Sequence, residues 1–378
     1  MLVRMADTLS SSERERYRRH LALSEIGAAG QEKLKGARVL IVGAGGLGSP
    51  AALYLAAAGC GTLGLLDCDR VDLSNLQRQV LFDTTLLGES KAEAGRAQLA
   101  ALNPEVRIIA HALELRASNV RELFAQYDLV LDGTDRLSAR YLINDACVIL
   151  RRPLVSAAIH RFEGHLMTYV PRQGPCYRCL FPQAADGMVA NCAEAGVLGV
   201  LPGVLGTLQA TEAIKLILGV GALLTGRLLT YDALEMRFTE FKVARRRDCA
   251  VCGDAPTITE PQDMPSNAAT PEGLRRLTAA ALHELLQRGE KPLLVDVRED
   301  AEFAAGHLEG ARHIPLGQLP QRLAEIDPQA DPVFICRSGG RSMAACQMAL
   351  RANIRSPANL EGGMLAWAAS IDPSLHVL

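Results

Sequence analysis

A glycine-rich turn between an apolar run and an alanine-rich stretch constrains the fold of this chain more than any other feature. Residues 38–42 read as a buried strand, and residues 43–48 have the sequence GAGGLG, a GxGxxG turn that opens a helix near Ser49. Glycines allow a tight turn and close backbone approach to a phosphate, and the helix N-terminus adds free N–H groups and a favourable dipole. The pattern predicts the nucleotide-binding βα unit of a doubly wound, mainly parallel sheet.

Groups that suit a triphosphate follow this turn. A second apolar run, residues 63–66, ends in Asp67, about 20 residues beyond the turn, where an acid commonly binds a ribose hydroxyl. Arg78 and Lys91 favour a nucleotide that loses pyrophosphate over a cofactor that passes a hydride. We therefore predict ATP. An NAD-dependent oxidoreductase is the alternative, and AMP formation against hydride transfer separates the two.

GAGGLG, LLDCD and DLSNLQRQ resemble motifs of the ubiquitin-activating-enzyme superfamily, in the branch of the molybdopterin-synthase adenylyltransferase type. The likeness covers about residues 10–253, and it implies a Rossmann-like adenylating domain, ATP, Mg²⁺ and a homodimer. The positions that it implies for the nucleotide are Gly43, Gly45, Gly46, Gly48, Asp67, Asp69, Ser74, Asn75, Leu76, Gln77, Arg78, Lys91 and Asp135. Of these, Arg78, Lys91 and Asp135 are also implied in catalysis.

Two of the implied catalytic positions have plainer alternatives. Asp135 follows the predicted strand 128–131, where a carboxylate beside the nucleotide would hold Mg²⁺, but it also suits a helix cap. Arg19 matches a family arginine that reaches the triphosphate from the partner subunit, and the alternative is a solvated helix face. The family usually has asparagine at the position of Arg136, so the resemblance leaves the role of this residue open.

Two Cys-x-x-Cys pairs predict a structural zinc site. The four thiolates come from Cys176, Cys179, Cys249 and Cys252. Each pair has knuckle spacing, and four sulfur ligands complete a tetrahedral shell with no open position for catalysis. The alternative is a pair of redox dithiols, which one Cys-x-x-Cys alone would favour. The related family has the same arrangement of cysteines.

Cys336 is the predicted sulfur-carrying residue. It follows the apolar run 333–335 and opens a loop that leads into a helix. Successive backbone N–H groups above a helix N-terminus stabilise an anion and therefore favour a thiolate. The predicted persulfide loop consists of Cys336, Arg337, Ser338, Gly339, Gly340 and Arg341. The alternative for Cys336 is a small buried apolar residue.

Residues 275–378 closely resemble the rhodanese family, which carries sulfur as a cysteine persulfide. The likeness is carried by the Cys336 loop, by VDVRE at residues 295–299 and by EFAAGHLEGARHIP at residues 302–315. The related phosphatase loop has one more residue between cysteine and arginine, so this loop suits a sulfur atom better than a phosphate. His313 replaces the familiar asparagine, with an expected effect on packing only, and Cys346 is expected to be a core residue.

Cys192 is a second candidate catalytic cysteine. It lies in the run 191–196, where the adenylating family often has a cysteine that forms a thioester or a mixed disulfide with its carrier. No Lys, Arg or His flanks it to activate the thiol, so a tolerated loop residue is the alternative. Cys60, Cys68 and Cys147 are expected to serve in packing.

Length and composition fit a two-domain cytoplasmic protein. At 378 residues and 49% hydrophobic content the chain exceeds one typical domain, and its net charge of −2 gives no indication of nucleic acid or anionic lipid as a partner. No uncharged apolar run reaches the ~18 residues that span a bilayer. The cysteines fall in functional clusters, which is typical of a reducing cytosol.

The predicted boundaries are an adenylating domain at 1–253, a Pro-rich exposed linker at 254–273 and a smaller α/β rhodanese-like domain at 274–378. Period-two patterns near residues 166–170 and 228–243 predict antiparallel additions to the first sheet.

Together these readings predict ATP-dependent adenylation of the C-terminal Gly-Gly of a ubiquitin-like sulfur carrier, followed by persulfide transfer to form a thiocarboxylate. The pathway would be of the molybdenum cofactor, thiamin or tRNA thiolation type, with a cysteine desulfurase or thiosulfate as sulfur donor. The alternative is an activating enzyme that forms a thioester for conjugation, with the second domain as a docking module. That reading needs Cys192 and leaves Cys336 dispensable.

Overall fold

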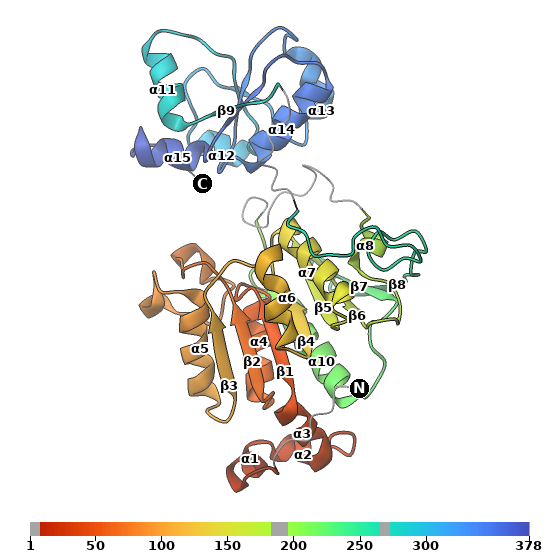
Figure 1. Ribbon diagram of the computed structural model, residues 1–378. Coiled ribbons are helices and arrows are strands. Elements are labelled where there is room, and N and C mark those ends of the chain that lie inside the picture. The colour runs from red at the N-terminus through yellow and green to blue at the C-terminus, as the bar shows by residue number, and fades with distance from the viewer. Residues whose placement is uncertain (1–7, 183–195, 265–272, 378) are drawn as a thin grey trace. The chain divides into compact units, whose positions relative to one another are not determined.

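The computed structural model describes residues 8–182, 196–264 and 273–377, which form two units (Figure 1). The first unit ends at Met264, and the second contains the described residues from Gly273 onwards. Each unit is an α/β structure built on its own sheet. Among the described residues no helix is both long and apolar enough to cross a membrane.

The first unit contains an eight-stranded sheet in the order β3-β2-β1-β4-β5-β6-β7-β8. The strands are β1 (Arg38–Val42), β2 (Thr62–Leu66), β3 (Arg107–His111), β4 (Leu129–Asp132), β5 (Leu154–His160), β6 (Glu163–Tyr169), β7 (Arg227–Asp232) and β8 (Arg237–Lys242). The first five run parallel, whereas β6, β7 and β8 pair antiparallel. The predicted mainly parallel sheet with antiparallel additions is therefore confirmed.

The helices of this unit are α1 (Ser11–Arg16), α2 (Arg18–Leu21), α3 (Gly27–Gly36), α4 (Gly48–Ala57), α5 (Lys91–Leu102), α6 (Ala117–Ala125), α7 (Leu137–Ile149), α8 (Tyr177–Leu180) and α10 (Val200–Leu218), with short 3₁₀ turns at Leu73–Asn75 and Thr84–Leu86. The longer helices cover both faces of the sheet. Successive side chains of a strand point to opposite faces, so Val39 and Ile41 pack with α3, α4, α5 and α10. Leu40 and Val42 pack with α6 and α7 on the other face.

The strand order reverses between β1 and β4: the chain proceeds outwards from β1 through β2 to β3 on one side, and from β4 to β5 on the other. In an open parallel sheet a ligand binds at the carboxyl ends of the strands where the order reverses, because the two loops there diverge and leave a crevice. The glycine turn after β1 and the turn after β4 meet at this point. The fold therefore positions the predicted nucleotide site.

Residues 254–264, the first part of the predicted exposed linker, are fastened to the first unit. Backbone N–H groups of Thr257 and Ile258 donate to the Ala250 carbonyl, both at 2.9 Å. The Asp263 carboxylate accepts from the first N–H of α6, at 2.8 Å. The low apolar content of this segment prevents it from forming a hydrophobic core. It can still bind the first unit, because capping a helix N-terminus needs only a carboxylate.

The second unit has a five-stranded, fully parallel sheet in the order β11-β10-β12-β13-β9. The elements are β9 (Arg275–Leu277), α11 (Ala279–Gln287), β10 (Leu294–Asp296), α12 (Asp300–Ala305), β11 (Arg312–His313), α13 (Leu319–Arg322), a 3₁₀ turn (Leu323–Glu325), β12 (Val333–Ile335), α14 (Gly340–Arg351), β13 (Ala358–Leu360) and α15 (Gly363–Ser370). One core contains α13 and α14, and the other contains α11 and α15. Cys336 directly follows the central strand β12.

Candidate functional site

The turn after β1 requires glycine at two positions. Gly43 has φ +92°, and a Cβ there would lie 2.8 Å from the carbonyl oxygen of Gly133 in the turn after β4. A Cβ on Gly48 would lie 1.8 Å from the Gly43 carbonyl oxygen. A side chain at Gly43 would push the turns after β1 and β4 apart, and one at Gly48 would distort the first turn itself, so both positions require glycine.

Asp67 at the end of β2 is fixed against this turn. Its two carboxylate oxygens accept the backbone N–H groups of Ala44 and Asp69, each at 2.8 Å. Burial raises the pKa of Asp67, while the nearby Lys91 ammonium and the two N–H groups oppose the rise. The carboxylate is thus held in one orientation beside the predicted phosphate-binding turn, as a ribose-binding acid requires.

Lys91, the first residue of α5, is a buried cation whose positive charge is only partly offset by the nearby carboxylate. Its side chain is 6% exposed, and its Nζ lies 3.3 Å from the carboxylate of Asp69, which is 64% exposed. A solvated carboxylate screens a buried ammonium only weakly, so an anionic ligand gains from this charge. Lys91 therefore has the surroundings expected of a phosphate-binding lysine.

The Ser74–Gln79 run lies beside the glycine turn. Arg78 donates to the Ser74 carbonyl at 3.0 Å, and its Cγ would lie 3.5 Å from a Cβ on Gly46. Gln79 is buried next to Gly45, and its Oε1 has no hydrogen-bond partner. The structure thus brings the predicted Arg78 together with the turn, and it adds Gln79 as a buried polar group that the sequence did not single out.

A buried carboxylate that the sequence did not identify as part of the site shapes the turn after β4. Asp132 is fully buried and bonds to the Arg140 guanidinium at 3.1 Å, the Ser156 hydroxyl at 2.9 Å and the Thr134 N–H at 3.0 Å. Its carbonyl accepts from Gln209 of α10 at 2.7 Å. The sequence signal that could have indicated this network is Gln209, a buried amide in the mostly apolar helix α10.

This network leaves Asp135 exposed at the carboxyl edge of the sheet. Arg136, the N-cap of α7, turns back across the edge to the Glu114 carboxylate at 3.4 Å and the Cys68 sulfur at 3.7 Å. The expectation that Cys68 serves in packing is wrong, because this thiol is exposed at the end of β2, whereas Cys60 and Cys147 are fully buried.

Arg19 is not brought to the glycine turn of its own chain. It lies exposed on α2, whose His20 contacts Gln31 at 3.0 Å, and Gln31 donates to the Ala58 carbonyl at 2.8 Å. Ala58 precedes the amino end of β2, so α2 lies at the edge of the sheet opposite the predicted nucleotide site (Figure 1). Within one chain this placement excludes a contact between Arg19 and a nucleotide bound there.

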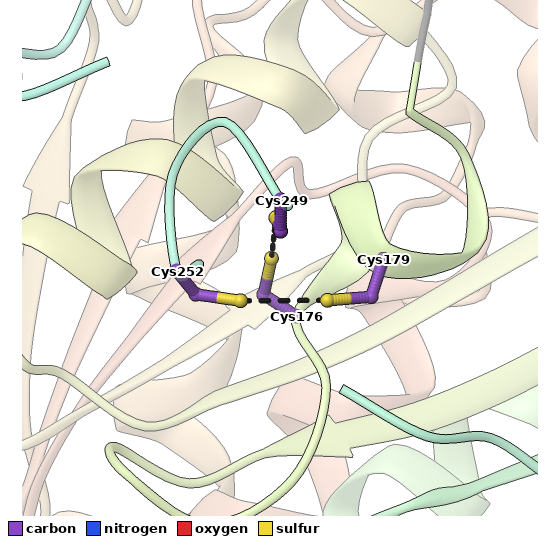
Figure 2. Close-up of side chains that lie close together, drawn as sticks. All are labelled: Cys176, Cys179, Cys249 and Cys252. Carbon is purple, nitrogen blue, oxygen red and sulfur yellow. Dashed lines mark hydrogen bonds between the residues drawn. The ribbon is translucent and has the colours of Figure 1, made fainter. Parts of the chain in front are cut away.

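The four predicted zinc ligands converge (Figure 2). All four sulfur atoms lie within 4.8 Å of one another, with 3.7 Å between Cys176 and Cys249 and 3.4 Å between Cys179 and Cys252. A zinc ion with bonds of about 2.3 Å to four thiolates needs sulfur separations of just this order. The cluster is compatible with a closed, structural zinc site.

Buried polar contacts fix the first knuckle on α7. Arg178, between the two cysteines of the pair, forms a two-point ion pair with Asp145 at 2.7 and 2.8 Å. The backbone N–H of Tyr177 donates to Asn144 at 2.8 Å. These contacts attach the knuckle to the first unit without a metal ion, so the fold itself positions its two sulfur atoms.

In the second unit, Cys336 is fully buried at the start of its loop, and its sulfur accepts hydrogen bonds. The sulfur accepts the Gly339 N–H at 3.0 Å and the Ser342 hydroxyl at 3.2 Å, and Ser342 also contacts Asn359 at 2.6 Å. Both donors belong to the N-terminal end of α14, whose dipole favours a negative charge. The surroundings stabilise a sulfur anion.

Two largely buried ion pairs lie next to the Cys336 loop. Arg341 forms a two-point ion pair with Glu302 at 2.6 and 2.7 Å, and the fully buried Arg298 does the same with Asp296. Gly339 has φ +99°, a conformation that side chains rarely adopt. Two of the predicted loop residues, Gly339 and Arg341, therefore help to set the geometry of the loop, together with Glu302 from outside it.

His313 does more than pack. Its ring stacks on Phe303 at 4.3 Å between centroids, and its Nε2 lies 2.8 Å from the Arg298 carbonyl. Cys346 is fully buried on α14, and burial raises the pKa of its thiol, as fits a core residue. Cys192 lies outside the described residues.

Ser342→Ala is expected to slow persulfide transfer about tenfold or more, because a hydrogen bond to a charged group contributes ~1.5–3 kcal/mol. The thiosulfate sulfurtransferase rate measures this effect. Ser370→Ala, which removes an exposed hydroxyl that donates to the Ala366 carbonyl at 2.6 Å, is the comparison. Equal rates in wild type and Ser342→Ala would contradict a role for this hydroxyl.

The first unit has a predicted nucleotide site at the carboxyl edge of a doubly wound sheet. The second unit has a cysteine loop whose N–H and hydroxyl donors stabilise a sulfur anion. Together in one chain, these two sites define an adenylating enzyme fused to a sulfurtransferase domain. Residues 17–251 match the model of the ThiF family, and residues 278–370 match that of the rhodanese-like domain. The chain belongs to the ThiF family and carries a C-terminal rhodanese-like domain. It is an adenylyltransferase and sulfurtransferase.

Curated relatives share this two-part organisation over nearly their whole length. The chain is 42% identical to the probable adenylyltransferase/sulfurtransferase MoeZ of Mycobacterium tuberculosis, over 99% of this chain and 97% of the relative. It is 40% identical to the adenylyltransferase and sulfurtransferase MOCS3 of Aedes aegypti, over 98% and 90%. In MOCS3 of Sus scrofa the identity is 42%, over 96% and 87%.

Solved structures of MccB from E. coli have a similar fold. The crystal structure titled as MccB with ATP superposes with a TM-score of 0.57 at 25% identity and covers 63% of this chain and 75% of that one. The complex with N-formylated MccA gives a TM-score of 0.57 at 24% identity, over 65% and 77%. The likeness supports the Rossmann-type fold of the first unit.

Proposed function

We propose that this enzyme adenylates the C-terminal Gly-Gly carboxylate of a small ubiquitin-like sulfur carrier and then converts it to a thiocarboxylate. The observation that carries the proposal is the Cys336 sulfur held by the Gly339 N–H at the start of α14, in the same chain as an ATP-binding ThiF domain. An enzyme that only adenylated its substrate would have no use for a second unit built around a stabilised sulfur anion.

The first step uses residues around the glycine turn. The carrier carboxylate attacks the α-phosphorus of ATP, an acyl-adenylate forms and pyrophosphate leaves. Lys91 and Arg78 offset the charge of the leaving pyrophosphate, while Asp67 orients the ribose. Asp69 and Asp135 are the exposed carboxylates at the strand ends, and they would hold Mg²⁺, which would neutralise phosphate charge there. The crystal structure of E. coli MccB with ATP, which has a similar fold, supports an ATP site on this fold.

The second step uses the cysteines. A Cys336 persulfide, charged by a cysteine desulfurase or by thiosulfate, attacks the carrier carbonyl with its outer sulfur and displaces AMP. A thiolate then attacks the inner sulfur of the resulting acyl disulfide, which leaves a thiocarboxylate on the carrier and a protein disulfide. Cys192 is the proposed attacking thiolate, and an external thiol reduces the disulfide to complete the cycle.

A second subunit completes the proposed nucleotide site. Arg19 cannot reach the turn of its own chain, since α2 lies at the opposite edge of the sheet. A homodimer that presents α2 to the partner's site would supply the arginine from outside. Conjugation remains the second candidate function: Cys192 would then take the carrier as a thioester, and Cys336 would be dispensable.

Lys91→Ala is expected to abolish carrier-dependent exchange of labelled pyrophosphate into ATP, because it removes the buried cation nearest Asp69. Arg78→Ala is expected to do the same. Losing one group that stabilises transition-state charge costs about 100- to 1000-fold in rate. The measurement is exchange with purified carrier as a function of ATP concentration.

The matched control is Lys33→Ala, whose ammonium donates to the Leu218 carbonyl away from the carboxyl edge. It should exchange pyrophosphate at the wild-type rate. Circular dichroism of all three variants separates lost chemistry from lost folding. Exchange at the wild-type rate in Lys91→Ala would refute the proposed site.

A further inference from the structure

Arg136 occupies a position where the family usually has asparagine, and it makes contacts that a much shorter amide side chain does not reach. One guanidinium nitrogen, Nη1, lies 3.4 Å from Glu114 Oε1, and the other, Nη2, lies 3.7 Å from Cys68 Sγ. Glu114 is itself paired with Arg116 at 2.6 Å, which holds the carboxylate in place. Both contacts of Arg136 are with segments distant in sequence.

These contacts cross the carboxyl edge of the sheet. Arg136 follows β4, Cys68 follows β2 and Glu114 lies beyond β3, whereas β1 runs between β4 and β2. Arg136 therefore links the loop after β4 to the segments after β2 and β3, at the same edge of the sheet as the glycine turn after β1.

A nucleoside bound at this edge must lie close to Arg136. Asp67, the proposed ribose-binding acid, immediately precedes Cys68, which Arg136 contacts. The N–H groups of the glycine turn, Lys91 and Arg78 are directed to phosphates. The base is the part of the nucleotide that these groups leave without a partner.

We propose that Arg136 binds the nucleoside part of ATP, with its planar guanidinium packed against the adenine ring. The inference rests on the proposed ATP-dependent adenylation and adds a specificity residue to it. A guanidinium stacks on aromatic faces while its edges donate hydrogen bonds. Glu114 contacts Nη1, and the side chain is 53% exposed, which leaves part of its surface available to a ring.

The charges around Arg136 favour the base over a phosphate as its target. The Glu114 carboxylate lies 3.4 Å from the guanidinium and offsets its charge. A phosphate brought to this side of Arg136 would meet that carboxylate, whereas a neutral aromatic ring would not be repelled by it. An asparagine at this position has neither the planar guanidinium group nor its positive charge.

The test measures how tightly the full-length protein binds adenosine, AMP and ATP by titration calorimetry. Arg136→Asn, the residue that the family usually has, is expected to weaken all three by a similar factor of about tenfold, the order of a partly desolvated cation–π contact. Adenosine is the decisive probe because it carries no phosphate. Glu114→Gln keeps the guanidinium and is expected to lose much less affinity for adenosine.

Three results would overturn the inference or its basis. If Arg136→Asn binds adenosine as tightly as wild type but loses AMP and ATP, Arg136 is a phosphate ligand. If Glu114→Gln loses as much adenosine affinity as Arg136→Asn, the ion pair rather than the stacking plane matters. If wild-type protein binds none of the three, the ATP site itself fails, which is a refutation of the proposed function and not of Arg136 alone.

Discussion

Cys336→Ala is expected to lose all thiosulfate sulfurtransferase activity and all formation of carrier thiocarboxylate, while carrier-dependent pyrophosphate exchange stays near wild type. Its sulfur is the one that accepts the Gly339 N–H and the Ser342 hydroxyl, so no other described cysteine has equivalent surroundings. The thiolate is the nucleophile that takes up and passes on sulfur, and it is needed only after the carboxylate has been activated. Mass spectrometry of the carrier detects replacement of an oxygen by sulfur.

Cys346→Ala is the matched control for this variant. Cys346 is also fully buried in the second unit, but it lies on α14 without the loop N–H groups. It should keep sulfur transfer with a modest loss of stability. Thiocarboxylate formed at the normal rate by Cys336→Ala from a physiological donor would show that the second unit is not a sulfur relay, and the conjugation function would then be favoured. Cys192→Ala should keep adenylation and slow the release of the carrier.

Cys249→Ala is expected to remove bound zinc and to unfold the first unit. Zinc binding to a structural site contributes ~10–16 kcal/mol, which is comparable to the whole stability of a typical domain, about 5–15 kcal/mol. Cys249 belongs to the second knuckle, and the metal would join it to Cys176, far away in the chain. Metal analysis of purified protein and thermal unfolding measure the two effects, with about one zinc per wild-type chain expected.

Cys147→Ala is the matched control, because Cys147 is fully buried in the same core as Cys249 but lies outside the sulfur cluster. It should keep its zinc and lose only about 1–2 kcal/mol for the small cavity. The cores of the second unit contain no residue of the first, so thiosulfate sulfurtransferase activity should survive in Cys249→Ala. Wild-type protein that is both metal-free and fully stable would refute the zinc site.

The sequence by itself determined what is encoded locally. The GxGxxG turn predicted a strand, a tight turn and a helix, because glycine spacing and apolar runs act over a few residues. The Cys-x-x-Cys spacing predicted two knuckles, and Cys336 before a glycine-containing loop predicted a sulfur-carrying site. The alternation of strands and helices predicted a parallel sheet with antiparallel additions, and the structure confirms it.

Only the tertiary structure decided how distant side chains meet. The sequence provided no reason to assign a role to Asp132, yet Arg140, Ser156 and Gln209 surround it in the folded chain. Such contacts depend on which strands are neighbours, and spacing in the sequence carries no information on that. Arg19 and the glycine turn lie at opposite edges of one sheet for the same reason.

Arg136 shows this division most clearly. The sequence revealed an arginine in place of asparagine, because a substitution is visible wherever a motif is known. What the side chain does with its extra length depended on the order β3-β2-β1-β4, which brings Cys68 and Glu114 within its reach at the same edge of the sheet. Local patterns fix which groups are available, and the packing of strands that are distant in sequence fixes which of them act together.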